Sequence, residues 1–219
     1  MNWGDFLAEI RVDIDDTAAT PKYSDKLLFS YLREAVADYS QFLPLTCEDV
    51  ELARDPGNSK KFLLPADFID DMAVACPAGR YLEPRRGRLG TKVAVSSRPL
   101  FYHTDGNRYL YLDADPEEDA VLLSYKALHP IPTSESETAF LFTIPDANLE
   151  LIKLYMAAKV NTKMRNSQAR LDRFKIGQGA RTDNPMSEEV EDFFHEYRRK
   201  LAQRLPSQPV ILYRPRRYK

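Results

Sequence analysis

The hydrophobic pattern of this chain changes its period twice, and that change limits the possible folds more than any other feature. Apolar residues recur at helical spacing as far as Pro44, alternate along short segments between residues 50 and 132, and return to helical spacing after Pro145. Helices, then strands, then helices again are typical of an α+β protein. We therefore predict an α+β fold: a four-helix bundle with a β-rich insert between helices 2 and 3 and an extended C-terminal tail.

The predicted bundle comprises residues 1–49 and 145–205, and the predicted insert comprises residues 50–132. Three side chains are expected to cap helices at their N-termini, namely Ser24, Asp146 and Ser187. The expected strands cover residues 61–64, 72–76, 92–96, 100–103, 109–113 and 121–125. The turn Asp105-Gly106-Asn107 predicts a hairpin between two of these strands. In the segment Tyr109-Leu110-Tyr111-Leu112 both strand faces are apolar or aromatic, so we expect one face in the core and the other against a neighbouring element or subunit.

Charge is distributed unevenly along the 219 residues, although the net charge is only −2. Residues 1–55 contain twelve acidic and five basic side chains, whereas residues 198–219 contain eight basic and no acidic side chains. Such asymmetry indicates a contact made by one terminus. No apolar run is long enough to span a bilayer, the first residues lack the pattern of a signal peptide, and the two cysteines fit no metal or redox spacing. We expect assembly in a reducing cytoplasm.

Catalytic and metal-binding patterns are not found in the sequence. His103, His129 and His195 are far apart in the chain, and no phosphate-binding or nucleophile motif occurs. The carboxylates between Asp113 and Asp119 could form a cation site, but a solvated turn explains them better. We predict a protein that is not an enzyme and that uses no metal and no cofactor.

Four arginines are concentrated near one predicted loop: Arg80, Arg85, Arg86 and Arg88. Two interpretations stay open at this point. The loop is either a solvated hairpin loop or a surface that contacts a partner or the phosphates of DNA in a channel.

The C-terminal tail, residues 206–219, contains three prolines that exclude a helix. It combines a short apolar run with a basic end, and the residues expected to bind a portal or a neighbouring subunit are Val210, Ile211, Leu212, Tyr213, Arg214, Arg216, Arg217, Tyr218 and Lys219. Four consecutive large apolar residues left in water would form an exposed hydrophobic patch. We therefore expect the tail to dock on another chain in preference to its own domain.

Several segments in this order resemble the head-to-tail adaptor (connector) proteins of tailed bacteriophages, of the kind called tail tubular protein A. They are Trp3-Gly4-Asp5-Phe6-Leu7-Ala8-Glu9-Ile10-Arg11, Tyr23-Ser24-Asp25-Lys26-Leu27-Leu28, Leu32-Arg33-Glu34-Ala35, Phe62-Leu63-Leu64-Pro65-Ala66-Asp67-Phe68, Leu123-Ser124-Tyr125 and Ile144-Pro145-Asp146. The resemblance extends over nearly the whole chain as an order of elements.

This resemblance implies a structural virion protein in the neck between head and tail, assembled in the host cytoplasm. It implies a ring of twelve copies that binds the portal protein and the tail or nozzle proteins. Such a ring encloses the channel through which DNA leaves during genome ejection, without sequence-specific binding. It also implies a C-terminal arm that reaches the portal or the adjacent subunit.

Two other functions stay open on the sequence alone. A DNA-binding or packaging accessory protein could use the arginine loop and the basic tail. A small hydrolase or cation-dependent enzyme could use the carboxylates between Asp113 and Asp119. The net charge of −2 argues against the first, and the isolated histidines argue against the second.

Overall fold

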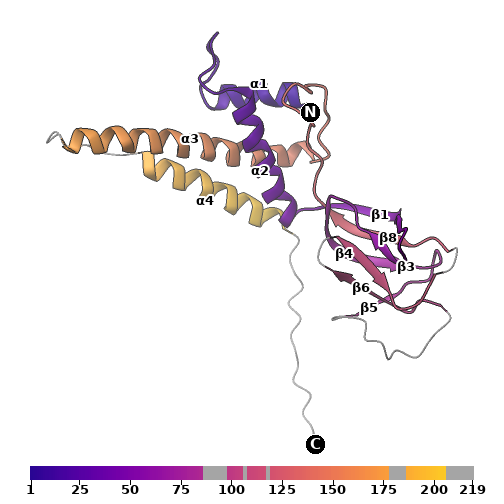
Figure 1. The fold of residues 1–219 in the computed structure, drawn as a ribbon. Coiled ribbons are helices and arrows are strands. Elements are labelled where there is room, and N and C mark those ends of the chain that lie inside the picture. Colours follow the sequence, from indigo (N-terminus) through magenta and orange to yellow (C-terminus); the bar gives the residue numbers. More distant parts are fainter. Residues whose placement is uncertain (86–97, 106–107, 117–118, 178–185, 206–219) are drawn as a thin grey trace, which may run out of the picture. The chain divides into compact units, whose positions relative to one another are not determined.

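A computed structural model describes residues 1–85, 98–105, 108–116, 119–177 and 186–205, which contain four helices and eight strands (Figure 1). The chain divides into two compact units, Met1–Ile152 and Lys153–Lys219. Each unit has buried side chains of its own and is described separately below.

The first unit begins with two helices whose N-termini are capped by side chains. The helix α1 (Trp3–Asp13) follows Asn2, whose side-chain oxygen accepts a hydrogen bond from the backbone N–H of Asp5 at 2.8 Å. The helix α2 (Asp25–Phe42) follows Ser24, whose hydroxyl accepts from the N–H of Leu27 at 3.3 Å. Each cap satisfies one of the N–H groups that a helix leaves unbonded at its start. The cap predicted at Ser24 is confirmed.

Two sheets follow in the first unit. The three-stranded sheet has the order β1-β8-β4, with β1 (Leu45–Glu51), β8 (Leu122–Ala127) and β4 (Phe68–Ala75). The five-stranded sheet has the order β2-β3-β7-β6-β5, with β2 (Arg54–Asp55), β3 (Asn58–Leu63), β7 (Tyr109–Leu112), β6 (Phe101–Asp105) and β5 (Glu83–Pro84). All neighbouring strands are antiparallel except β5 and β6, which are parallel.

One apolar core joins the two sheets. It receives buried side chains from both of them, among which Leu110 and Leu123 are fully buried. The hydroxyl of Tyr102 on β6 also donates a hydrogen bond to the carboxylate of Asp71 on β4, so a polar contact links the sheets as well. Burial and this contact raise the pKa of the Tyr102 phenol, which therefore stays protonated and remains a donor.

The second unit contains two helices. The helix α3 (Asp146–Gly177) begins in the first unit, and α4 (Met186–Arg204) lies wholly in the second. The ring of Tyr155 on α3 makes edge-to-face contacts with Phe194 and Tyr197 on α4, with centroid distances of 5.8 and 5.4 Å. Such contacts stabilise the pair beyond the burial of apolar area.

The predicted four-helix bundle is wrong. The protein has an α+β fold with a β-rich core and two sheets. Trp3 and Phe6 on α1 contact the rings of Phe29 and Phe142 within the first unit, whereas α4 packs on α3 in the second. An amphipathic pattern shows that a helix buries one face, but it does not show which element covers that face.

Candidate assembly surfaces

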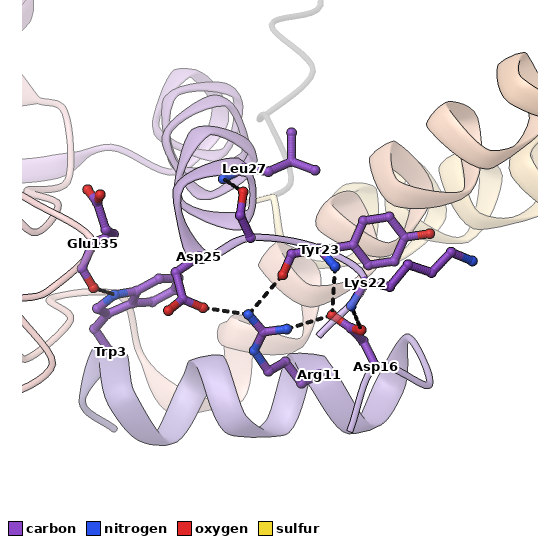
Figure 2. Close-up of polar contacts among 9 residues, drawn as sticks. Trp3, Arg11, Asp16, Lys22, Tyr23, Asp25, Leu27 and Glu135 are labelled. Carbon is purple, nitrogen blue, oxygen red and sulfur yellow. Dashed lines mark hydrogen bonds and ion pairs between the residues drawn. The ribbon is translucent and has the colours of Figure 1, made fainter. Parts of the chain in front are cut away.

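The N-terminal motif of the sequence forms a charged cluster around Arg11, shown in Figure 2. The guanidinium of Arg11 donates to Asp16 at 2.5 Å, to Asp25 at 2.5 Å and to the carbonyl oxygen of Tyr23 at 3.0 Å. One side chain on α1 therefore binds the loop that follows α1 and the first turn of α2. Planar guanidinium groups suit such multiple contacts because their N–H groups form a fixed fork.

Asp16 is the buried member of this Arg11 cluster, with 3% of its surface exposed. Its carboxylate also accepts hydrogen bonds from the backbone N–H groups of Lys22 at 2.5 Å and Tyr23 at 3.2 Å. The chain can enter this tight loop because Asp15 adopts a left-handed conformation with φ of 53°. The sequence pattern did not reveal the cluster, since Asp13, Asp15 and Asp16, grouped at the end of a predicted helix, also fit a solvated loop.

Trp3 connects α1 to a second distant segment. Its indole N–H donates to the carbonyl oxygen of Glu135 at 3.1 Å, and its backbone N–H donates to the carbonyl oxygen of Phe140 at 2.8 Å. A side chain on Gly4 would place its Cβ 3.1 Å from the Cβ of Thr138. That contact would be tighter than most Cβ contacts, so glycine lets α1 and Thr138 approach without displacing either. The Trp3-Gly4 pair thus holds α1 against residues 135–140.

His129 joins the end of α2 to the end of β8 and is buried. Its Nε2 lies 3.1 Å from the carbonyl oxygen of Leu43, to which it donates, and its Nδ1 lies 2.8 Å from the hydroxyl of Thr143. Its backbone N–H donates to the buried hydroxyl of Ser40 at 3.1 Å. These contacts use both ring nitrogens for structural hydrogen bonds. Burial lowers the pKa of His129, which favours the neutral ring.

Acidification should destabilise the first unit through His129. The unfolded chain binds a proton at the ordinary histidine pKa of about 6.5, whereas the folded chain binds it only at lower pH. The unfolded state therefore holds more protons between those two values, and stability falls as pH decreases through that window. We expect urea midpoints at pH 7.5 and pH 5 to differ less in the variant His129→Gln than in the parent chain. The control variant His195→Gln, at an exposed position, should show the same difference between the two urea midpoints as the parent chain. If His129→Gln also shows the parent difference, His129 is not the group that makes stability depend on pH.

The arginine loop is described only at its beginning. Arg80 lies in the turn after β4, where its backbone N–H donates to the carbonyl oxygen of Pro77 at 3.0 Å. Arg85 is exposed, its backbone N–H donates to Tyr102 at 2.9 Å, and its guanidinium lies 5.3 Å from the ring centroid of Phe101. Arg86 and Arg88 lie outside the described residues.

The variant Arg85→Gln should lower the free energy of unfolding by no more than about 1 kcal/mol, since an exposed cation–π contact contributes roughly that much. The sequence predicts a surface loop here, so replacing Arg85, Arg86 and Arg88 together should lower the free energy of unfolding by no more than about the same amount, because exposed charges contribute little. Urea unfolding of the isolated chain measures both effects. A loss above about 2 kcal/mol for the triple variant would show that the loop is structural.

The residues of the C-terminal tail that the sequence singled out all lie outside the described residues: Val210, Ile211, Leu212, Tyr213, Arg214, Arg216, Arg217, Tyr218 and Lys219. The described chain ends at Leu205, directly after α4.

Two of the carboxylates between Asp113 and Asp119 bind the chain itself, and Glu117 and Glu118 lie outside the described residues. Asp113 accepts hydrogen bonds from the backbone N–H groups of Leu100 and Phe101 at 3.0 and 3.1 Å, and Asp115 accepts from the hydroxyl of Ser59 at 2.5 Å. Among the described residues, no group of three or more His, Cys, Asp or Glu side chains is placed to hold a metal ion. No helix within the described ranges is long and apolar enough to cross a membrane.

The five-stranded sheet has an aromatic outer face. Leu110 and Leu112 point into the core, so the alternating side chains of Tyr109 and Tyr111 lie on the opposite face. Strand register places Leu63 opposite Tyr109, and both Lys61 and His103 opposite Tyr111. Phe101 shares this face because its neighbour Tyr102 is in the core. We call these side chains the outer aromatic face: Lys61, Leu63, Phe101, His103, Tyr109 and Tyr111.

Cations cover part of the outer aromatic face. The ammonium of Lys61 lies 3.8 Å from the ring centroid of Tyr109 and 2.9 Å from the carboxylate of Asp55, and the guanidinium of Arg108 lies 5.4 Å from the same ring. The hydrogen bond from Lys61 lowers the pKa of Asp55 and raises that of Lys61, so both groups are charged at neutral pH. The rings therefore accept cations on their faces.

The described residues form an α+β scaffold whose polar clusters bind the chain itself. A family model described as SU10 adaptor protein matches residues 1–204. The chain therefore belongs to this family, a family of structural phage head-to-tail adaptors, and the resemblance seen in the sequence is confirmed. A search of curated proteins found no match.

Proposed function

We propose that this chain is a non-catalytic virion protein that forms a ring of twelve copies between the portal and the tail. The ring joins the portal protein to the tail or nozzle proteins and encloses the channel through which DNA leaves the head. It is assembled in the host cytoplasm and stays in the neck of the virion. The observation that carries this proposal is the family match over residues 1–204.

The described contacts support a role in assembly. His129, the histidine most deeply buried, uses its ring nitrogens for structural hydrogen bonds, and the carboxylates at Asp113 and Asp115 bind the chain itself. The Arg11 cluster joins α1 to α2, and the Trp3 contacts join α1 to residues 135–140. These contacts are structural as well, and closed symmetric rings are built from such folded subunits.

Two parts of the chain are proposed to make contacts in the ring. The C-terminal arm, residues 206–219, docks on the portal or on the next subunit. The arginine loop faces a partner or the DNA channel, where Arg80, Arg85, Arg86 and Arg88 contact phosphates without reading sequence.

Mass measurement of the purified chain, alone and mixed with the portal protein of the same phage, tests this proposal. A ring of defined stoichiometry, free or bound to the portal, is the expected result. A monomer that does not bind the portal protein but binds DNA with an affinity that falls as salt is raised would instead indicate the DNA-binding accessory function. A monomer that binds neither would also contradict the proposal.

A further inference from the structure

The outer aromatic face differs from the outer face of the other sheet in the same unit. The outward positions of the three-stranded sheet are polar or aliphatic: they include Thr46, Ser124 and the ion pair of Lys126 with Asp70 at 3.3 Å, together with Leu122 and the 52% exposed Met72. A sheet of this size normally has one face in the core and one solvated face. Within the described residues, no strand of the three-stranded sheet places an aromatic side chain on its outer face, whereas the five-stranded sheet has Phe62 and Tyr102 in the core and Phe101, Tyr109 and Tyr111 on the opposite face. Aromatic rings on both faces of one sheet make its outer face a candidate contact surface.

The charges around the outer aromatic face favour protein over nucleic acid as the occupant. Three cations and three carboxylates lie on it or at its rim, namely Lys61, Arg85, Arg108, Asp55, Glu83 and Asp105. Such a balanced set gives no net attraction to a phosphate backbone. Tyrosine, phenylalanine and arginine are enriched in protein interfaces.

The chain itself carries a segment that fits this face. Val210, Ile211, Leu212 and Tyr213 are consecutive, lie between prolines and are followed by basic residues. Fourteen residues in extended form span about 46 Å. A compact unit of about 150 residues has a radius of gyration of only roughly 15 Å. The arm is therefore long enough to leave its own subunit and cross a face of the next one.

We propose that the outer aromatic face is the docking site for the C-terminal arm, residues 206–219, of a neighbouring copy of the chain. This inference rests on the proposed ring and names one of its contacts. The apolar run of the arm covers Leu63, Tyr109 and Tyr111. The following arginines stack on ring faces, as Arg85 and Arg108 already do in the same chain, or pair with Glu83 and Asp105 at the rim.

Photo-cross-linking of the full-length chain tests the contact. The variant Tyr213→p-benzoylphenylalanine is prepared in unlabelled and in ¹⁵N-labelled form, the two are mixed and assembled, and the sample is irradiated with and without the portal protein. Mass spectrometry then gives the attached residues and shows whether one labelled and one unlabelled chain are joined. We expect cross-links between different chains at residues 61–63, 101–103 and 109–111.

A pair of matched variants makes the test specific. Leu63→Ser with Tyr111→Ser removes apolar area from the outer aromatic face and should lower the cross-link yield at least about tenfold. Met72→Ser with Tyr81→Ser removes similar side chains from exposed positions off that face, 52% and 70% exposed, and should leave the yield unchanged. Urea unfolding checks that both variants are folded.

The other outcomes overturn the inference. Cross-links within one chain would assign the arm to its own subunit, and cross-links to the portal would assign it there. A ring that forms normally but is cross-linked elsewhere would contradict this docking site and leave the proposed adaptor function intact. Failure to form any ring, with or without the portal, would contradict the function itself.

Discussion

Replacing Arg11 by alanine should lower the free energy of unfolding of the first unit by about 3 to 5 kcal/mol. The side chain of Arg11 is 15% exposed and that of Asp16 only 2%. Removing the guanidinium leaves the carboxylate of Asp16 buried without its ionic partner, and breaking a buried ion pair costs more than the pair contributes. Asp25 and the carbonyl oxygen of Tyr23 lose a donor at the same time.

Urea unfolding followed by circular dichroism measures this loss, with Arg33→Ala as the matched control. Arg33 is an exposed arginine on α2, and its replacement should change stability by less than about 0.5 kcal/mol. Arg11→Lys keeps the charge but lacks the forked guanidinium that reaches the three acceptors at once. Its loss of stability should therefore lie between those of Arg11→Ala and Arg33→Ala.

A double-mutant cycle separates the ion pair from simple loss of packing. Asp16→Asn removes the charge and keeps one acceptor oxygen, so it can retain the bond from the N–H of Lys22 but not also the bond from the N–H of Tyr23, which goes to the other carboxylate oxygen. If the pair is coupled, Arg11→Ala should cost less in the Asp16→Asn background than in the parent chain. Equal costs in both backgrounds would mean that Arg11 stabilises the unit by packing alone.

The regular elements were largely predictable because they depend on local patterns. The alternation of Tyr109, Leu110, Tyr111 and Leu112 predicted β7, and the Asp105-Gly106-Asn107 turn predicted its antiparallel pairing with β6. The cap at Ser24 follows from the intrinsic preference of serine for that position. Such signals act within a few residues, so one sequence contains them in full.

The strand β1 was missed for a local reason. Its acidic residues Glu48, Asp49 and Glu51 disfavour a strand, and the pairing register shifts between Cys47 and Val50. Asp49 has φ of 51°, and such a bulge interrupts the period of two on which strand prediction rests. The expected strand at residues 92–96 lies outside the described residues.

The errors at larger scale concern partners that are distant in the sequence. Four amphipathic segments do not specify whether their apolar faces meet one another, and here Phe6 meets Phe142 while Tyr155 meets Phe194. The same limit applies to the Arg11 cluster, in which Asp16 and Asp25 lie five and fourteen residues from Arg11. Any nearby carboxylate could have been the partner, and only the fold selects these two.

Deleting residues 206–219 should leave a folded subunit that no longer joins the ring or the portal stably. The four apolar residues of the arm contribute about 1.5 to 3 kcal/mol each if fully buried. Ordering the arm on docking costs conformational entropy, which offsets part of that gain. The prolines lower this entropy cost because they already restrict the free arm. A net loss of at least about 2.7 kcal/mol, or 100-fold in affinity, is therefore expected.

Two replacement variants show which half of the arm carries this effect. Changing Val210, Ile211, Leu212 and Tyr213 to serine keeps the charges and should weaken assembly nearly as much as the deletion. Changing Arg214, Arg216, Arg217 and Lys219 to glutamine keeps the apolar run and should mainly slow association. That second effect should shrink as salt is raised, because exposed charges are screened beyond about 8 Å at physiological ionic strength.

Assembly is followed by light scattering or by co-purification with the portal protein, and unfolding in urea serves as the control for folding. The deletion should leave the urea midpoint of the subunit unchanged, since the described core ends before residue 206. If the truncated chain assembles with the affinity of the full chain, the arm is not the docking element. If it assembles poorly but also unfolds at lower urea, the arm packs on its own subunit, and its apolar run stabilises the fold instead of the ring.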